Sequence, residues 1–163
     1  MFTELFRLEA PWPGWLAISA RPRGGEWLDQ EMRVWRSTGV DVFVSLLEAA
    51  DLDLEDERAH GEANGIEFHS FPIPDRSVPA GFDIRKFVSD LDSKLSQGKN
   101  VAIHCRQGIG RAGLIAAALL IEQGLGPEEA IKRVSAARRI PIPETEEQKL
   151  WIESFAASLA RKH

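Results

Sequence analysis

Apolar positions along the chain follow two spacings, one typical of buried strands and one typical of amphipathic helices. Continuous apolar and β-branched runs predict strands at residues 15–22, 40–47, 66–74 and 100–105. Helical spacing of apolar residues, with glycine and proline at the ends, predicts helices at residues 25–39, 80–98, about 112–123, 126–139 and 145–160. The acidic stretch at residues 48–65 predicts a loop followed by a helix.

Strands that alternate with helices are typical of α/β folds. We therefore predict one domain over residues 1–163, with a mostly parallel central sheet flanked by helices. A chain of 163 residues with 44% hydrophobic composition can bury one sizeable core, and no repeat or linker divides it. In such sheets the functional site lies beyond the carboxyl ends of the strands.

Charge and composition narrow the classes of partner. The net charge of −5 argues against a nucleic-acid or anionic-membrane surface. The N-terminus lacks the basic start and apolar run of a signal peptide, and the longest apolar stretch, residues 112–121, is too short to span a bilayer. A single cysteine fits a reducing compartment. We expect a soluble, cytoplasmic protein.

That cysteine, Cys105, stands between the predicted strand at residues 100–105 and an apolar helix, in the stretch IHCRQGIGRAG. Glycines in the connecting loop allow backbone N–H groups to turn toward one centre, and the following helix adds the positive end of its dipole. Such a cradle suits a tetrahedral dianion such as phosphate, and its field favours thiolate over thiol. Arg111 can grip two phosphate oxygens. The cradle residues are Arg106, Gln107, Gly108, Ile109 and Gly110.

Two simpler interpretations remain open for this stretch. A lone cysteine with apolar neighbours is often a small buried hydrophobe. A glycine-rich turn between a strand and a helix also binds phosphate without chemistry in nucleotide folds, although neither Gly-Lys-Ser nor Gly-x-Gly-x-x-Gly is present.

The stretch HCRQGIGRAG resembles the His-Cys-x5-Arg signature of the cysteine-dependent protein tyrosine and dual-specificity phosphatases. The late position of the signature distinguishes the chain from the low-molecular-weight tyrosine phosphatases, and its small size resembles the dual-specificity branch. The resemblance implies that Cys105 is a nucleophile that forms a cysteinyl-phosphate, that Arg111 and the loop bind phosphate, and that His104 holds the loop and tunes the thiolate. It implies neither a metal nor a cofactor.

The same resemblance implies a general acid on an upstream loop. The stretch FPIPDRSVPAGFD offers Asp75, between prolines that stiffen the loop. A phosphatase needs this acid because the leaving oxygen must be protonated. Asp75 as a plain turn residue is the alternative, and Asp83, a rival for the acid, is expected in the first turn of the next helix.

Four further positions carry expectations of their own. The family usually has Ser or Thr after the signature arginine, whereas this chain has Ala112, which predicts slow hydrolysis of the phosphoenzyme. It also leaves open a weakly active phosphate-binding pseudoenzyme. Gln148 stands where several family members have a glutamine near the pocket, but its helical context favours an exposed side chain. Arg138 and Arg139 are expected to cap a helix or to join a basic rim.

The chain contains no tyrosine, so it lacks the tyrosine that clamps phosphotyrosine in the larger tyrosine-specific domains. We expect a shallow, dual-specificity-like site. The expected substrate is a phosphorylated protein or peptide, with phosphotyrosine first and phosphoserine and phosphothreonine as extensions. A small phosphorylated metabolite such as an inositol phosphate is the alternative.

Overall fold

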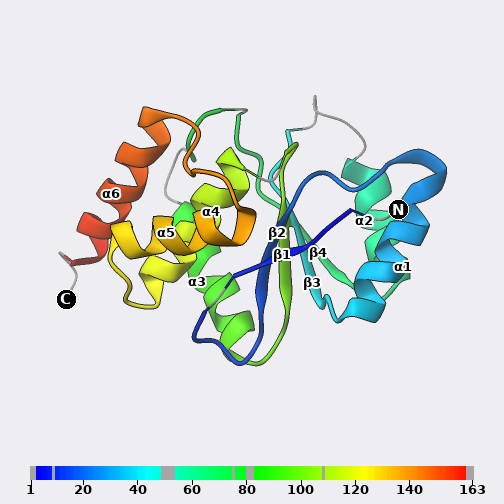
Figure 1. Cartoon of the computed structure of the whole chain (residues 1–163). Helices are drawn as coiled ribbons and strands as arrows, with labels where there is room; N and C mark the ends of the chain where they lie inside the picture. Colours follow the sequence, from blue (N-terminus) through cyan, green and yellow to red (C-terminus); the bar gives the residue numbers. More distant parts are fainter. Residues whose placement is uncertain are drawn as a thin grey trace.

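The computed structural model describes residues 3–8, 10–48, 54–74, 76–79, 83–107 and 109–160. Within them, five strands form one sheet in the order β1-β2-β5-β3-β4 (Figure 1). The strands are β1 (Phe6–Arg7), β2 (Leu16–Ser19), β3 (Val42–Ser45), β4 (Glu67–Ser70) and β5 (Val101–His104). β1 is antiparallel to β2, and the other neighbours are parallel.

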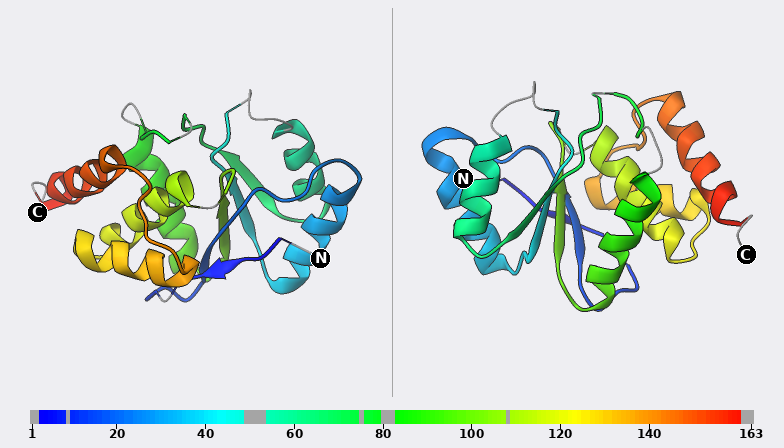
Figure 2. Two further views of the ribbon diagram at one scale, coloured as in Figure 1. Left: turned by 45° about the horizontal axis from the view of Figure 1, so that its top comes forward. Right: turned by 180° about the vertical axis from the view of Figure 1, so that it is seen from behind.

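Helices cover both faces of the sheet (Figure 2). One face carries α1 (Leu28–Thr38) and α2 (Leu54–Ala63), and the short 3-10 helix η1 (Gly25–Trp27) leads into α1. The other face carries α3 (Asp83–Ser96), α4 (Gly110–Glu122), α5 (Pro127–Arg138) and α6 (Glu146–Ala160). The predicted α/β fold with a mostly parallel central sheet is confirmed.

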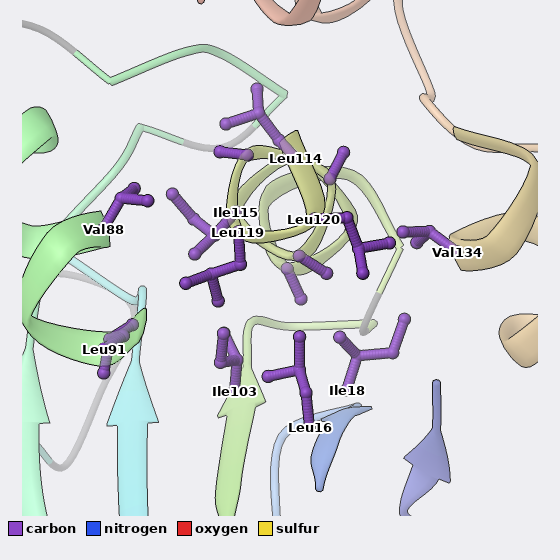
Figure 3. Close-up of a cluster of buried hydrophobic side chains, with 14 of the residues drawn as sticks. Leu16, Ile18, Val88, Leu91, Ile103, Leu114, Ile115, Leu119, Leu120 and Val134 are labelled. Atoms are coloured by element: carbon purple, nitrogen blue, oxygen red, sulfur yellow. The ribbon is translucent and has the colours of Figure 1, made fainter. Parts of the chain in front are cut away.

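α4 is the centre of the larger core. Its apolar residues face every direction, so the helix must be covered all round. Ile115, Leu119 and Leu120 point toward the sheet and the neighbouring helices, where they meet side chains of β2, β5, α3 and α5, whereas Leu114 lies on the side of α4 that faces away from the sheet (Figure 3). Each such side chain contributes about 1.5–3 kcal/mol through burial. This packing fixes the N-terminal end of α4 against the carboxyl end of β5.

The predicted elements are present with shifted ends. α4 begins at Gly110, two residues earlier than predicted, so Arg111 belongs to its first turn. β4 stops at Ser70, before the proline at position 72 that cannot donate to a ladder. β1 was not predicted because two residues carry no periodic signal. Among the described helices, none has the length and apolar character needed to cross a membrane.

Candidate active site

Cys105 lies at the middle of the sheet edge where the parallel strands end. It directly follows β5, which pairs with both β2 and β3. Its side chain is 3% exposed, contacts the larger core and lines a cavity of about 180 Å³. The cavity is lined by Arg76, Cys105, Arg106, Gln107, Gly110, Arg111 and Glu144. Cys105 is therefore more than a core hydrophobe, because it also faces a hollow lined by polar groups.

The loop after Cys105 holds its carbonyl groups in fixed directions. The carbonyl oxygen of Arg106 accepts a hydrogen bond from the backbone N–H of Arg21 at 3.1 Å. The carbonyl oxygen of Gln107 accepts one from Nη2 of Arg138, also at 3.1 Å. In a trans peptide the C=O and N–H point in opposite directions, so the N–H of Gln107 faces away from Arg21. Gly108 lies outside the described residues.

Arg111 is buried beside the cysteine. Its side chain is 2% exposed, and Nη1 donates to the carbonyl oxygen of Ile73 at 2.9 Å. This bond ties the first turn of α4 to the proline-rich segment that follows β4. The first turn of α4 also supplies backbone N–H groups and the positive end of the helix dipole at the cavity. Asp75, two residues after Ile73, lies outside the described residues.

Two charged residues that the sequence did not predict also line the cavity. Nη1 of Arg76 and Oε2 of Glu144 form an ion pair at 3.3 Å. A Cβ added at Gly110 would lie only 2.3 Å from Oε1 of Glu144, so the glycine makes room for this carboxylate. Both residues lie in proline-bounded segments after regular elements, and such segments often carry site residues.

Gln148 is fully buried, and the expectation of an exposed side chain is wrong. Its Oε1 accepts hydrogen bonds from the backbone N–H groups of Glu144 at 3.2 Å and Thr145 at 3.3 Å. Its Nε2 donates to the carbonyl oxygen of Ser77 at 3.1 Å. These hydrogen bonds offset the free-energy cost of removing the amide group from water. Gln148 thereby joins the segments that carry Arg76 and Glu144, and its Nε2 would lie 3.0 Å from a Cβ at Gly110.

The remaining predicted site residues that the structure describes are not among those that line the cavity. His104 is fully buried; its Nε2 is 3.0 Å from Oε1 of Glu57, and its ring stacks on Phe43. Ala112 is buried in the larger core, and the half-buried side chain of Ile109 packs against that core. Arg139 ends α5 in a left-handed conformation, which fits the expected role at the helix end.

The cavity is positively charged although the chain is acidic overall. Among the described residues, three guanidinium groups and one carboxylate line it, in a chain with a net charge of −5. Arginine forks and a helix N-terminus are donors that suit a phosphate or sulfate-like anion. With a thiol at the same cavity, the arrangement can bind a tetrahedral anion and place a nucleophile beside it.

Comparison with known proteins agrees with this geometry. The family model for "Polymorphic toxin system, DSP-PTPase phosphatase" matches residues 19–125. Protein tyrosine phosphatase type IVA 3 of Bos taurus is 35% identical over 85 residues, 51% of this chain and 49% of that protein. Putative tyrosine phosphatase 197R of Invertebrate iridescent virus 6 is 33% identical over 133 residues, 77% of this chain and 46% of that protein.

Solved structures extend the similarity over most of the chain. Tk-PTP in its active form has a TM-score of 0.74 at 28% identity, covering 87% of this chain and 91% of that one. Kinase associated phosphatase, with its catalytic site cysteine replaced by serine, has a TM-score of 0.81 at 20% identity, covering 97% of this chain and 96% of that one. The second likeness concerns the fold alone.

The chain spans about half the length of the curated relatives that it matches. The family model nevertheless covers the segment from Ser19, the last residue of β2, to the residues after α4, including the cysteine loop. The chain belongs to the DSP-PTPase phosphatase family.

Proposed function

We propose that the chain hydrolyses phosphate monoesters through a cysteinyl-phosphate formed on Cys105. The observation that carries this proposal is that Cys105 and Arg111 line the same small, positively charged cavity at the N-terminus of α4. A thiolate there meets the bound phosphorus, while the guanidinium and the helix end hold the anion in place.

The proposed reaction has two steps. In the first, the Cys105 thiolate attacks phosphorus, an S–P bond forms, and the ester P–O bond breaks as Asp75 gives its proton to the leaving oxygen. In the second, Asp75 accepts a proton from water, the water oxygen bonds to phosphorus, and the S–P bond breaks to return the thiolate. Neither step needs a metal or a cofactor.

The transition-state charge falls on the equatorial phosphate oxygens. We assign their stabilisation to the guanidinium of Arg111 and to the backbone N–H groups of residues 106–111. Such preorganised donors typically make the largest single contribution to catalysis in sites of this kind. Gln148 acts as a support, since its hydrogen bonds join the segments on either side of the cavity. We assign to His104 the holding of the loop and the tuning of the thiolate, while Ala112 offers no hydroxyl to the departing thiolate.

We propose a phosphorylated protein or peptide as the substrate, with phosphotyrosine first. The rim supports an anionic partner because Arg76 and Arg106 are exposed and line the cavity. A small phosphorylated metabolite is the second candidate, since the same two arginines suit a second phosphate group. Equal concentrations of phosphopeptides, inositol phosphates and nucleotides separate the two, with kcat/KM as the readout.

We also propose that residues 1–163 form one phosphatase domain that acts in the cytoplasm. The support for this location is chemical: a reactive thiolate is oxidised readily, and a reducing compartment keeps it active.

The deciding experiment is steady-state hydrolysis of para-nitrophenyl phosphate by the wild-type chain and by Cys105→Ser. The proposal predicts many turnovers per chain, all lost in the variant. The matched control is Ser93→Ala, on α3 and not among the residues that line the cavity, and it should keep the turnover of the wild-type chain. A folded wild-type chain that binds phosphate without turning over would identify a phosphate-binding pseudoenzyme.

A further inference from the structure

We propose that Glu57 of α2 is a positioning residue for the nucleophile. It keeps the ring of His104 protonated on both nitrogens, and the resulting positive charge behind the loop favours the thiolate of Cys105. This inference rests on the proposed function of Cys105. Glu57 neither lines the cavity nor belongs to the signature, and it acts only through His104.

Burial makes the contact between the two side chains strong. The side chain of Glu57 is 2% exposed and that of His104 is fully buried, with Oε1 and Nε2 3.0 Å apart. A buried carboxylate without a partner is costly, and a hydrogen-bonded ion pair is the usual solution. The ring is also held by stacking on Phe43 of β3, with centroids 4.9 Å apart and planes inclined by 16°.

The atoms that face the two ring nitrogens set the protonation of the ring. Nε2 faces a carboxylate oxygen of Glu57, and Nδ1 faces the carbonyl oxygen of Cys105 at 3.4 Å. An ionised carboxylate and a carbonyl can only accept hydrogen bonds. A neutral imidazole has one N–H and can satisfy only one of them, whereas the imidazolium satisfies both.

The ring therefore carries charge next to the nucleophile. His104 precedes Cys105 in the chain and lies between the Cys105 backbone and the carboxylate of Glu57. The positive ring is thus nearer the loop than the negative carboxylate, and the pair as a whole favours an anion on the loop side.

The other charged groups near Cys105 and His104 do not belong to the ion pair of His104 and Glu57. The described charged groups that share the cavity with Cys105 are Arg76, Arg106, Arg111 and Glu144. The sheet neighbours of His104 are Ser19 on β2 and Ser45 on β3, neither of which is charged. Among the described residues, Glu57 is the charged side chain that contacts the ring, so substituting it isolates its contribution to the charge of the ring.

The protonation of His104 is measured directly by nitrogen NMR of histidine-labelled wild-type chain at pH 7.5. The chain has four histidines, and Asn variants of His60, His69 and His163 assign His104 by elimination. We expect two N–H signals from the His104 ring. A neutral ring with a single protonated nitrogen would overturn the proposal, and this result needs no variant of Glu57 to fold.

The consequence for the thiol is measured by alkylation with iodoacetamide, an uncharged reagent, at pH 6 and without substrate. We expect Glu57→Gln to slow the alkylation of Cys105 about tenfold, because the amide no longer requires a charged ring. The matched control is Glu31→Gln. Glu31 is also buried and hydrogen-bonded, but its partners are Thr3 and Arg23.

The outcomes separate this inference from the proposed function. Unchanged or faster alkylation in folded Glu57→Gln would refute the role of Glu57, even if the wild-type chain were an active phosphatase. Slow alkylation in Glu57→Gln alone, together with a doubly protonated ring in the wild-type chain, would support it. Absence of turnover in the wild-type chain would refute the proposed function and leave the alkylation result readable.

Discussion

Arg76 and Glu144 form an ion pair at the cavity that contains Cys105, although 68 positions separate them in the chain. The Arg76 side chain is 62% exposed and that of Glu144 is 24% exposed, so the pair is reachable from solvent. An anion that enters the cavity competes with the carboxylate for the same guanidinium. The pair thus links substrate binding to the segments on both sides of the cavity.

Replacing Arg76 by alanine should weaken binding more than it slows chemistry. Arg76 is exposed and lines the cavity, so we expect it to contact the substrate before reaction. Its loss should raise KM for para-nitrophenyl phosphate about threefold while kcat stays close to wild type. Steady-state kinetics measure both. Arg33→Ala is the matched control, since Arg33 is an exposed arginine that pairs with Asp29 on α1. A fall in kcat with unchanged KM would contradict this role.

We compare two carboxylates as donors of the proton to the leaving oxygen: Asp75, which the family resemblance implies, and Glu144, which lines the cavity. A general acid matters most when the leaving group is poor, so Asp75→Asn should cost roughly 10²-fold with phenyl phosphate and less with para-nitrophenyl phosphate. Glu144→Gln should affect both substrates alike, because its carboxylate is held by Arg76 and lies against Gly110. The opposite pattern in kcat would assign the acid to Glu144.

Because alanine stands at position 112, we expect the phosphoenzyme to accumulate during turnover. Because this chain has no hydroxyl after Arg111, we expect the departing thiolate to lack a hydrogen bond worth about 1 kcal/mol. Rapid-quench kinetics of the wild-type chain should therefore show a burst of product of about one equivalent per site, and Ala112→Ser should raise the steady-state rate several-fold. Absence of a burst, together with no gain from the serine, would show that hydrolysis is not the slow step.

Much of the fold could be predicted from local pattern. The uninterrupted apolar stretch at residues 112–121 needs cover on all sides, and α4 is accordingly the central helix of the larger core. Cys105 and Arg111 could be placed because a strand, a glycine-rich loop and a helix follow one another directly in the chain. Such signals depend on neighbours within a few residues.

The other site features depend on contacts between distant segments. Glu144 meets Arg76 and Gly110 only after α5 and the following loop return to the cavity. Gln148 looks like an exposed position among acidic neighbours, yet carbonyl and N–H groups from two loops satisfy its amide. Glu57 belongs to an acidic helix, and only the fold brings it to His104. The spacing of apolar and polar residues within one segment cannot predict these contacts between distant segments.

Glu67 on β4 should make stability depend on pH in the acidic range. Hydrogen bonds from Lys94 at 2.6 Å and from His69 lower the pKa of its carboxyl from 4.5 to about 2. The lowered pKa means that the stabilisation is complete above about pH 4.5 and is lost as the pH falls toward 2. Since the side chain is 39% exposed, the contribution at neutral pH should be about 1 kcal/mol or less.

Urea unfolding of the wild-type chain and Glu67→Gln at several pH values tests this. The two free energies of unfolding should differ at pH 7 and converge as the pH falls toward 2. Glu153→Gln, at an exposed position on α6, serves as the control. A constant difference across this range would contradict the assignment.

The most direct measurement traps the covalent intermediate. The wild-type chain is mixed with excess para-nitrophenyl phosphate, quenched in acid within milliseconds, digested and analysed by mass spectrometry. The account predicts one phosphoryl group on the peptide that contains Cys105, absent in Cys105→Ser. Turnover without any phosphoryl group on that peptide, or with the group on another residue, would contradict it.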